Sequence, residues 1–112
     1  MVPGLPVSAQ MRKGVLEYCV LACMISGPTY GLAIAKRLAV HPDLLTSEGT
    51  LYPLLSRLRK QGLVETTWQE SPTGPPRRYY SLTAQGLTSV AGFAAGWGPF
   101  SKAVSDVLRE AM

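Results

Sequence analysis

The segment from Ser47 to Leu82 constrains the fold of this 112-residue chain more than any other, because the period of its hydrophobic residues changes along it. Its first part predicts an amphipathic helix that Ser47 caps and that ends at Gly62, where a left-handed residue is favoured. The leucines at helical spacing are Leu51, Leu54, Leu55 and Leu58. Arg57 and Lys60 lie away from this stripe and are expected on the helix surface.

The second part of the segment predicts a β-hairpin. Polar and apolar residues alternate from Val64 to Gln69, and the strand pattern returns at Tyr79–Leu82 after a turn over residues 71–76. Arg77 and Arg78 stand beside the tip of this hairpin. A helix followed by a basic hairpin is the layout of a winged helix, and this layout points to DNA.

Three further helices are predicted outside this segment, over residues 9–25, 30–39 and 84–112, with Ser8, Thr29 and Thr83 as their caps. The Pro- and Gly-rich residues 1–8 are expected to form a flexible arm. The chain is long enough for one domain with a modest core. We therefore expect an α+β, mainly α, winged helix-turn-helix over residues 9–82, with a two-stranded wing, followed by a C-terminal helix over residues 83–112.

Two helices contain residues that disfavour a helix. Pro53 lies within the third helix, where it lacks an N–H and crowds the carbonyl of Gly49, so a tightened or kinked first turn is predicted. Gly96, Gly98 and Pro99 interrupt the last helix, and a bend near Trp97 is predicted.

The charge of the chain is unevenly distributed. The formal net charge is +4, and between Arg12 and Arg78 nine Lys or Arg face five Asp or Glu, whereas charges balance from Tyr79 onward. This distribution suits a part that binds a polyanion joined to a part that oligomerises. The composition, 46% hydrophobic and 16% charged, favours burial of some surface against a second copy of the chain.

Membrane and enzyme functions find little support in the sequence. The apolar run Met11–Ile25 contains Glu17 and is too short for a membrane span, so a cytoplasmic location is expected. Cys19 and Cys23 are expected to be reduced packing residues. The single histidine lies in a Pro-flanked turn, and no motif predicts a catalytic site, a metal or a cofactor.

Several short motifs closely resemble the PadR family of bacterial transcriptional regulators, over about residues 15–86. They are Tyr30-Gly31, Thr50-Leu51-Tyr52-Pro53, Arg57-Leu58 before Gly62-Leu63, and Arg78-Tyr79-Tyr80 leading to Leu82, Thr83 and Gly86. The resemblance implies a homodimeric regulator, usually a repressor, that leaves its operator when a small molecule binds. The single helix after Thr83 is similar to the short subfamily, in which the first and last helices build the dimer.

Some short members carry a Trp in the last helix that stacks flat, hydrophobic compounds in a pore at the dimer centre, and Trp97 stands at the corresponding place. The present chain departs from them in the Gly- and Pro-rich GWGPF stretch around Trp97, and its Phe93 is one residue out of step. The resemblance thus implies a planar aromatic effector, whereas the shape of the pore is specific to this chain.

The candidate contacts to double-stranded DNA lie at the start of the second helix, on the third helix and on the wing. They are Tyr30, Ser47, Thr50, Tyr52, Pro53, Arg57, Lys60, Arg77, Arg78 and Tyr79. Thr50 is expected to bond a base or phosphate and Pro53 to touch a thymine methyl, because the start of a recognition helix reaches base edges. The wing arginines suit phosphates or the minor groove. The sequence leaves open whether Tyr52 is a core residue and whether Tyr30 packs against the wing. The alternation of the strand predicts that Tyr80 and Leu82 face inward.

The candidate effector contacts form two stripes, one on the first helix and one on the last. They are Met11, Val15, Tyr18, Ala22, Val90, Phe93, Ala94, Trp97 and Ser101. Close packing in a dimer core is the alternative role for Trp97, Phe93 and Phe100.

Sequence reasoning thus predicts a homodimeric DNA-binding repressor that engages a pseudo-palindromic operator. Two alternatives stay open. One is a winged-helix module that binds a protein or a small molecule but not DNA, and the other is a regulator with a solid dimer core and no effector.

Overall fold

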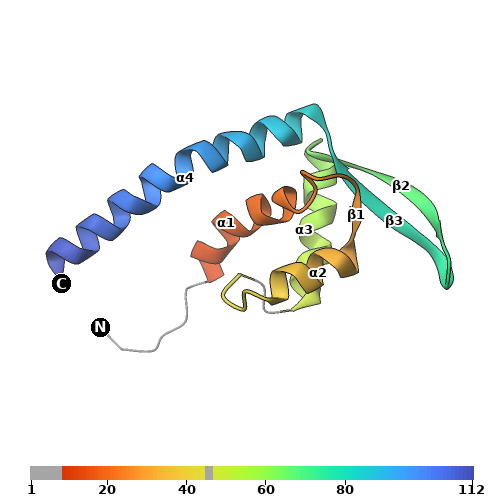
Figure 1. Cartoon of the computed structure of the whole chain (residues 1–112), viewed down its shortest axis with the longest axis horizontal. Coiled ribbons are helices and arrows are strands. Elements are labelled where there is room, and N and C mark those ends of the chain that lie inside the picture. Colours follow the sequence, from red (N-terminus) through yellow and green to blue (C-terminus); the bar gives the residue numbers. More distant parts are fainter. Residues whose placement is uncertain (1–8, 45–46) are drawn as a thin grey trace.

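The computed structural model describes residues 9–44 and 47–112 (Figure 1). Its elements, in chain order, are α1 (Ala9–Ala22), β1 (Thr29–Tyr30), α2 (Gly31–Ala39), α3 (Glu48–Lys60), β2 (Val64–Ser71), β3 (Gly74–Leu82) and α4 (Ala84–Ala111). The predicted N-terminal arm and the cap at Ser8 lie outside the described residues. α1 ends earlier than predicted, because Met24 and Ile25 donate to carbonyls three residues back and Gly27 then adopts a φ of 139°.

β1 is an element that the sequence reading missed. Thr29 was predicted to cap the second helix, but it pairs with Tyr80 of β3, and Tyr30 pairs with Tyr79. Tyr30 takes the N-cap position of α2 and its side chain makes no capping hydrogen bond. The extended residues after Pro28 thus tie the start of α2 to the sheet.

α3 follows the prediction at both ends. Ser47 occupies the N-cap position with a φ of −160°, although its hydroxyl lies 3.2 Å from that of Thr50 and makes no capping bond to the backbone. The Thr50 N–H donates to the Ser47 carbonyl at 3.3 Å, which tightens the first turn, and the helix continues through Pro53. Gly62 has a φ of 77°, and with Leu63 it closes a Schellman motif that ends the helix.

The sheet is antiparallel, with the strand order β1-β3-β2. The predicted turn over residues 71–76 is shorter in the structure, because Pro75 and Pro76 belong to β3. They lie where the register shifts, between the pairs Gln69↔Arg77 and Ser71↔Gly74, and β1 does not reach that part of β3. A bulge and an unpaired edge tolerate prolines, since no ladder hydrogen bond is lost there.

A hydrophobic cluster joins the helices to the base of the sheet. The four leucines of α3 are buried in it as predicted, together with Val20 and Leu21 of α1 and Ile34 and Leu38 of α2. Tyr80 is also buried, and Leu82 is half-buried against the cluster, which confirms that both face inward.

α4 leaves this core as one helix of 28 residues. The Thr83 hydroxyl caps it by accepting from the Gly86 N–H at 3.0 Å, and it donates to the Gly62 carbonyl at 2.6 Å. The predicted bend near Trp97 does not interrupt the helix, which continues through Pro99, and its second half extends beyond α1 (Figure 1). Together α2, α3 and the β2–β3 wing form a winged helix-turn-helix.

Candidate nucleic-acid interface and ligand groove

The face of α3 opposite its buried leucines is open to solvent. Thr50, Tyr52 and Pro53 are exposed along its first half, between the exposed Ser47 and Lys60. Tyr52 has 49% of its surface exposed, so it is not a core residue. α3 therefore offers a polar and aromatic surface of the kind that enters a DNA groove.

A hollow of about 390 Å³ separates this face from the wing. Its lining combines aromatic and basic side chains from α2, α3 and the sheet, namely Tyr30, Gly31, Leu32, Tyr52, Trp68, Arg77, Arg78 and Tyr80. We call it the wing hollow. It lies beside the first residues of α2, whose N–H groups have no side-chain cap. A helix start and two guanidinium groups make this region electropositive.

Aromatic rings support both wing arginines. The Arg77 guanidinium carbon lies 4.5 Å from the centre of the Tyr30 ring, which meets Tyr79 edge-on at 5.4 Å. The Arg78 guanidinium carbon lies 5.3 Å from the centre of the Trp68 ring. Neither arginine forms an ion pair with a carboxylate of the described residues. The Arg78 Nε is buried and lacks a hydrogen-bond partner there.

The two short motifs that contain Tyr30 and Tyr52 meet in space. A Cβ atom added to Gly31 would lie 2.7 Å from atoms of the Tyr52 ring, so only glycine lets this ring pack against the start of α2. Tyr30 thus supports the wing through Arg77, while its neighbour Gly31 positions Tyr52.

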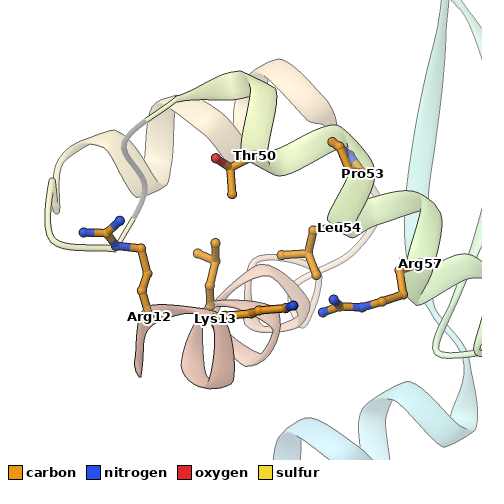
Figure 2. A pocket seen from close by; sticks show the side chains of 7 residues that line it. Arg12, Lys13, Thr50, Pro53, Leu54 and Arg57 are labelled. Carbon is orange, nitrogen blue, oxygen red and sulfur yellow. The ribbon is translucent and has the colours of Figure 1, made fainter. Parts of the chain in front are cut away.

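A second hollow, of about 430 Å³, lies on the other flank of α3, between α3 and α1 (Figure 2). We call it the α1–α3 hollow. Its lining residues are Arg12, Lys13, Leu16, Thr50, Pro53, Leu54 and Arg57. Arg57, predicted to contact phosphate, points to α1 and donates to Glu17 at 3.1 Å. The ends of Lys13 and Arg57 point toward each other across this hollow.

A row of aromatic rings connects α1 to α4. Tyr18 stacks on Phe93 with ring centres 4.2 Å apart and planes at 6°, Phe93 stacks on Trp97 at 5.5 Å, and Trp97 lies 6.3 Å from Phe100. The row borders a groove of about 380 Å³ lined by Gly14, Val15, Gly92, Phe93, Gly96, Trp97 and Phe100. A Cβ atom on Gly14, Gly92 or Gly96 would meet nothing within 4 Å, so these glycines leave the groove open.

The remaining effector candidates lie outside this lining. Val90 is 3% exposed in the core, and Ala22 packs against it. Met11 and Ala94 are exposed, and the Ser101 hydroxyl donates to the Gly98 carbonyl at 3.1 Å. Of the two predicted stripes, the structure brings together Val15, Tyr18, Phe93 and Trp97.

Some residues of these surfaces were not among the candidates. Trp68 lies opposite Arg78 in the hairpin, and pairing the strands outward from the turn would have indicated it. Arg12 and Lys13 were counted only as charge, because nothing in the sequence brings the start of α1 beside α3. Gly96 was noted beside Trp97, but Gly14 and Gly92 gave no signal, because open space beside a glycine is a property of packing.

Chemically reactive groups are scarce in the described part of the chain. No group of three or more metal-binding side chains occurs in residues 9–44 and 47–112. Burial raises the pKa of the Cys19 thiol, and likewise that of Cys23. Both thiols therefore stay protonated at neutral pH and act as packing groups. Over the same ranges, no helix is long and apolar enough to cross a membrane.

Comparison with known proteins gives a consistent result. The model of the transcriptional regulator PadR-like family matches residues 20–91. A PadR-like transcriptional regulator from Bacillus cereus is 40% identical, with a TM-score of 0.78 and coverage of 89% of this chain and 97% of that one. A PadR family transcriptional regulator from Eggerthella lenta is 35% identical, with a TM-score of 0.74 and coverage of 88% and 86%.

A more distant similarity concerns the fold. Bacillus subtilis PadR, in a crystal structure with operator DNA, is 21% identical, with a TM-score of 0.64 and coverage of 71% of this chain and 45% of that one.

Proposed function

Because the chain belongs to the PadR-like family of transcriptional regulators, we propose that it is a cytoplasmic, homodimeric repressor that binds a pseudo-palindromic operator. In this proposal, the repressor leaves its operator when a planar aromatic molecule binds at the dimer interface. The family consists of transcriptional regulators, not enzymes. Residues 9–82 form the DNA-binding unit in this proposal, and residues 83–112 supply dimerisation and, with α1, effector binding.

The observation that carries DNA binding is the pair of wing arginines beside the exposed face of α3. Arg77 and Arg78 are oriented by aromatic rings and have no carboxylate partner among the described residues, so phosphate can take that position. Thr50 and Pro53 lie at the end of α3 that would approach base edges. Bacillus subtilis PadR, which shares the fold, forms a complex with operator DNA, and this supports the proposal that the present chain binds DNA.

The hydroxyl groups of Tyr30 and Tyr52 add hydrogen-bonding capacity around the wing hollow, whose volume suits a backbone phosphate and its sugar. The N–H groups at the start of α2, which the side chain of the N-cap residue does not bond, favour an anion at the same place. Arg57 contributes less in this proposal, because Glu17 already neutralises its charge.

Apolar side chains along the second half of α4 support the proposed dimer. They are Phe100, Val104, Val107 and Leu108, and each is at least 44% exposed. They share one face of the helix, whereas Lys102, Asp106 and Arg109 form ion pairs on another. An apolar stripe of this length on a projecting helix is stabilised by a second copy of the same helix.

The groove beside Trp97 supports effector binding. Its row of stacked rings offers flat apolar faces, and its glycines leave space that a planar aromatic molecule can fill. α1 forms one wall of this groove and also packs against α3. A ligand that binds better to one relative orientation of the two subunits would change the spacing of the two α3 helices and so release the operator.

Selection from a pool of random duplexes tests the DNA-binding claim. The expected product is a pseudo-palindrome whose half-sites lie about one helical turn apart. Failure to enrich any duplex at low salt would favour the alternative of a winged-helix interaction module.

Titration of the Trp68→Phe variant with planar aromatic compounds tests the effector claim, because Trp97 is then the single tryptophan of the chain. Quenching of its fluorescence together with release of the selected duplex is expected. Binding without release, or no binding across the panel, would contradict this part of the proposal and favour a regulator with a solid dimer core.

A further inference from the structure

The α1–α3 hollow has a basic rim that the wing does not explain. Lys13 is exposed, and the Arg12 Nε donates to the Asp43 carbonyl at 2.9 Å, which leaves its charge unneutralised. Arg57 adds a third cation, and its partner Glu17 is the one carboxylate paired with any of the three among the described residues. The hollow therefore carries a positive excess that attracts an anion.

The two basic hollows lie on opposite flanks of α3. Thr50, Pro53 and Arg57 line the α1–α3 hollow, whereas Tyr52 lines the wing hollow. By helical spacing these flanks enclose the exposed face of α3 between them. A helix in the major groove has one sugar-phosphate backbone on each side, because the groove is about 12 Å wide and bounded by both strands.

We propose that the α1–α3 hollow receives the sugar-phosphate backbone on the side of α3 away from the wing, with Lys13 as its main phosphate contact. The inference rests on the proposed DNA binding and extends it to a second backbone. Arg12 adds positive charge beside Lys13, and its Nε bond to Asp43 restrains it. The apolar floor of Leu16 and Leu54 suits the face of a deoxyribose. The wing then contacts one of the two DNA strands that border the major groove, and the α1–α3 hollow contacts the other.

Hydroxyl-radical footprinting on the duplex selected with the unaltered protein tests this inference, because the reagent reports protection of individual sugars. The test compares Lys13→Gln with the double variant Arg77→Ala/Arg78→Ala. Lys102→Gln is the matched control, since it removes the same charge from the far half of α4. Lys13 is exposed, so circular dichroism is expected to show an unchanged fold.

In each half-site, Lys13→Gln is expected to remove protection from one backbone segment and to leave the segment protected by the wing, while the arginine variant gives the opposite result. The magnitude of the slope of log K against log salt should fall by about 0.9 for each lost phosphate contact, and so by about 1.8 for a dimer, which carries Lys13 in both protomers. Lys102→Gln should match the unaltered protein in both measurements.

An unchanged footprint and salt slope for Lys13→Gln would overturn the inference, and so would loss of the same segment in both variants. Either result leaves the proposed DNA binding intact as long as the unaltered protein protects the duplex. If the unaltered protein protects no segment at any salt concentration, the proposed function itself fails.

Discussion

At the scale of single residues, the structure explains why the short motifs of this chain contain particular residue types. Position 31 must be glycine because a Cβ atom there would meet the ring of Tyr52. Position 86 must be glycine because a Cβ atom there would overlap the Leu63 carbonyl. Tyr30 combines a strand position with support for Arg77. These contacts join residues far apart in the chain, so the sequence indicated that the residues mattered but not what they touch.

Gly31→Ala tests the position of Tyr52. The added methyl meets the far end of an exposed side chain, which can swing away, so the free energy of unfolding should change by less than about 1 kcal/mol. Affinity for the selected duplex should nevertheless fall, because Tyr52 leaves its place beside the wing hollow. Tyr52→Ala, measured in parallel, should show a similar loss. Unchanged DNA affinity in both variants would contradict a DNA-contacting role for Tyr52.

Trp97→Ala distinguishes an effector groove from a packed dimer core. In a groove, the variant should lose binding of planar aromatic compounds, while thermal unfolding shows a loss of less than about 1 kcal/mol. In a packed core, removal of a buried indole should cost about 3–5 kcal/mol. Calorimetry on the same samples measures both quantities, and the larger destabilisation would support the ligand-independent alternative.

At the scale of elements, residues with a strong periodic pattern were predictable. The leucine stripe and Gly62 predicted the position and the end of α3, and Thr83 predicted the start of α4. These predictions were possible because helix period and capping are local properties. β1 could not be found, since a two-residue strand has no period and exists only through its pairing with β3. The prolines of β3 were assigned to the turn because a bulge depends on the partner strand.

The contact between the end of α3 and the start of α4 predicts a sharp cost for Gly86→Ala. The new methyl would overlap the backbone carbonyl of Leu63, which cannot move without disturbing the Thr83 hydrogen bonds. We expect a loss of about 1–3 kcal/mol in urea unfolding. Gly98→Ala is the matched control, because its methyl meets nothing within 4 Å, and it should be neutral or stabilising. Equal stabilities for the two variants would contradict this packing.

At the scale of the whole molecule, three surfaces surround one core: two basic hollows flank α3, and an aromatic groove joins α1 to α4. The uneven charge of the sequence predicted this division in outline. It could not predict that the start of α1 lies beside α3, because that position depends on how the helices pack. α1 contributes to both the groove and the α1–α3 hollow, so it is the element through which effector and DNA would be coupled.

The proposed dimer depends on the apolar stripe of α4. Val107→Asp introduces a charge into this stripe and is expected to yield monomers by analytical ultracentrifugation, since an unpaired charge is costly to bury. Ala95→Asp places the same charge on the opposite face of α4 and should leave the assembly unchanged. A dimer that persists in Val107→Asp with undiminished stability would contradict the assigned interface.

The salt dependence of operator binding tests the central claim most directly, because it measures how many phosphates the protein neutralises. Fluorescence anisotropy with the selected duplex, between about 50 and 200 mM salt, should give a steep linear fall of log K against log salt for the unaltered protein. Arg77→Ala/Arg78→Ala should bind more weakly and with a smaller slope, while Lys102→Gln should match the unaltered protein. A slope that is the same in the arginine variant, or the absence of salt-sensitive binding in the unaltered protein, would contradict the account.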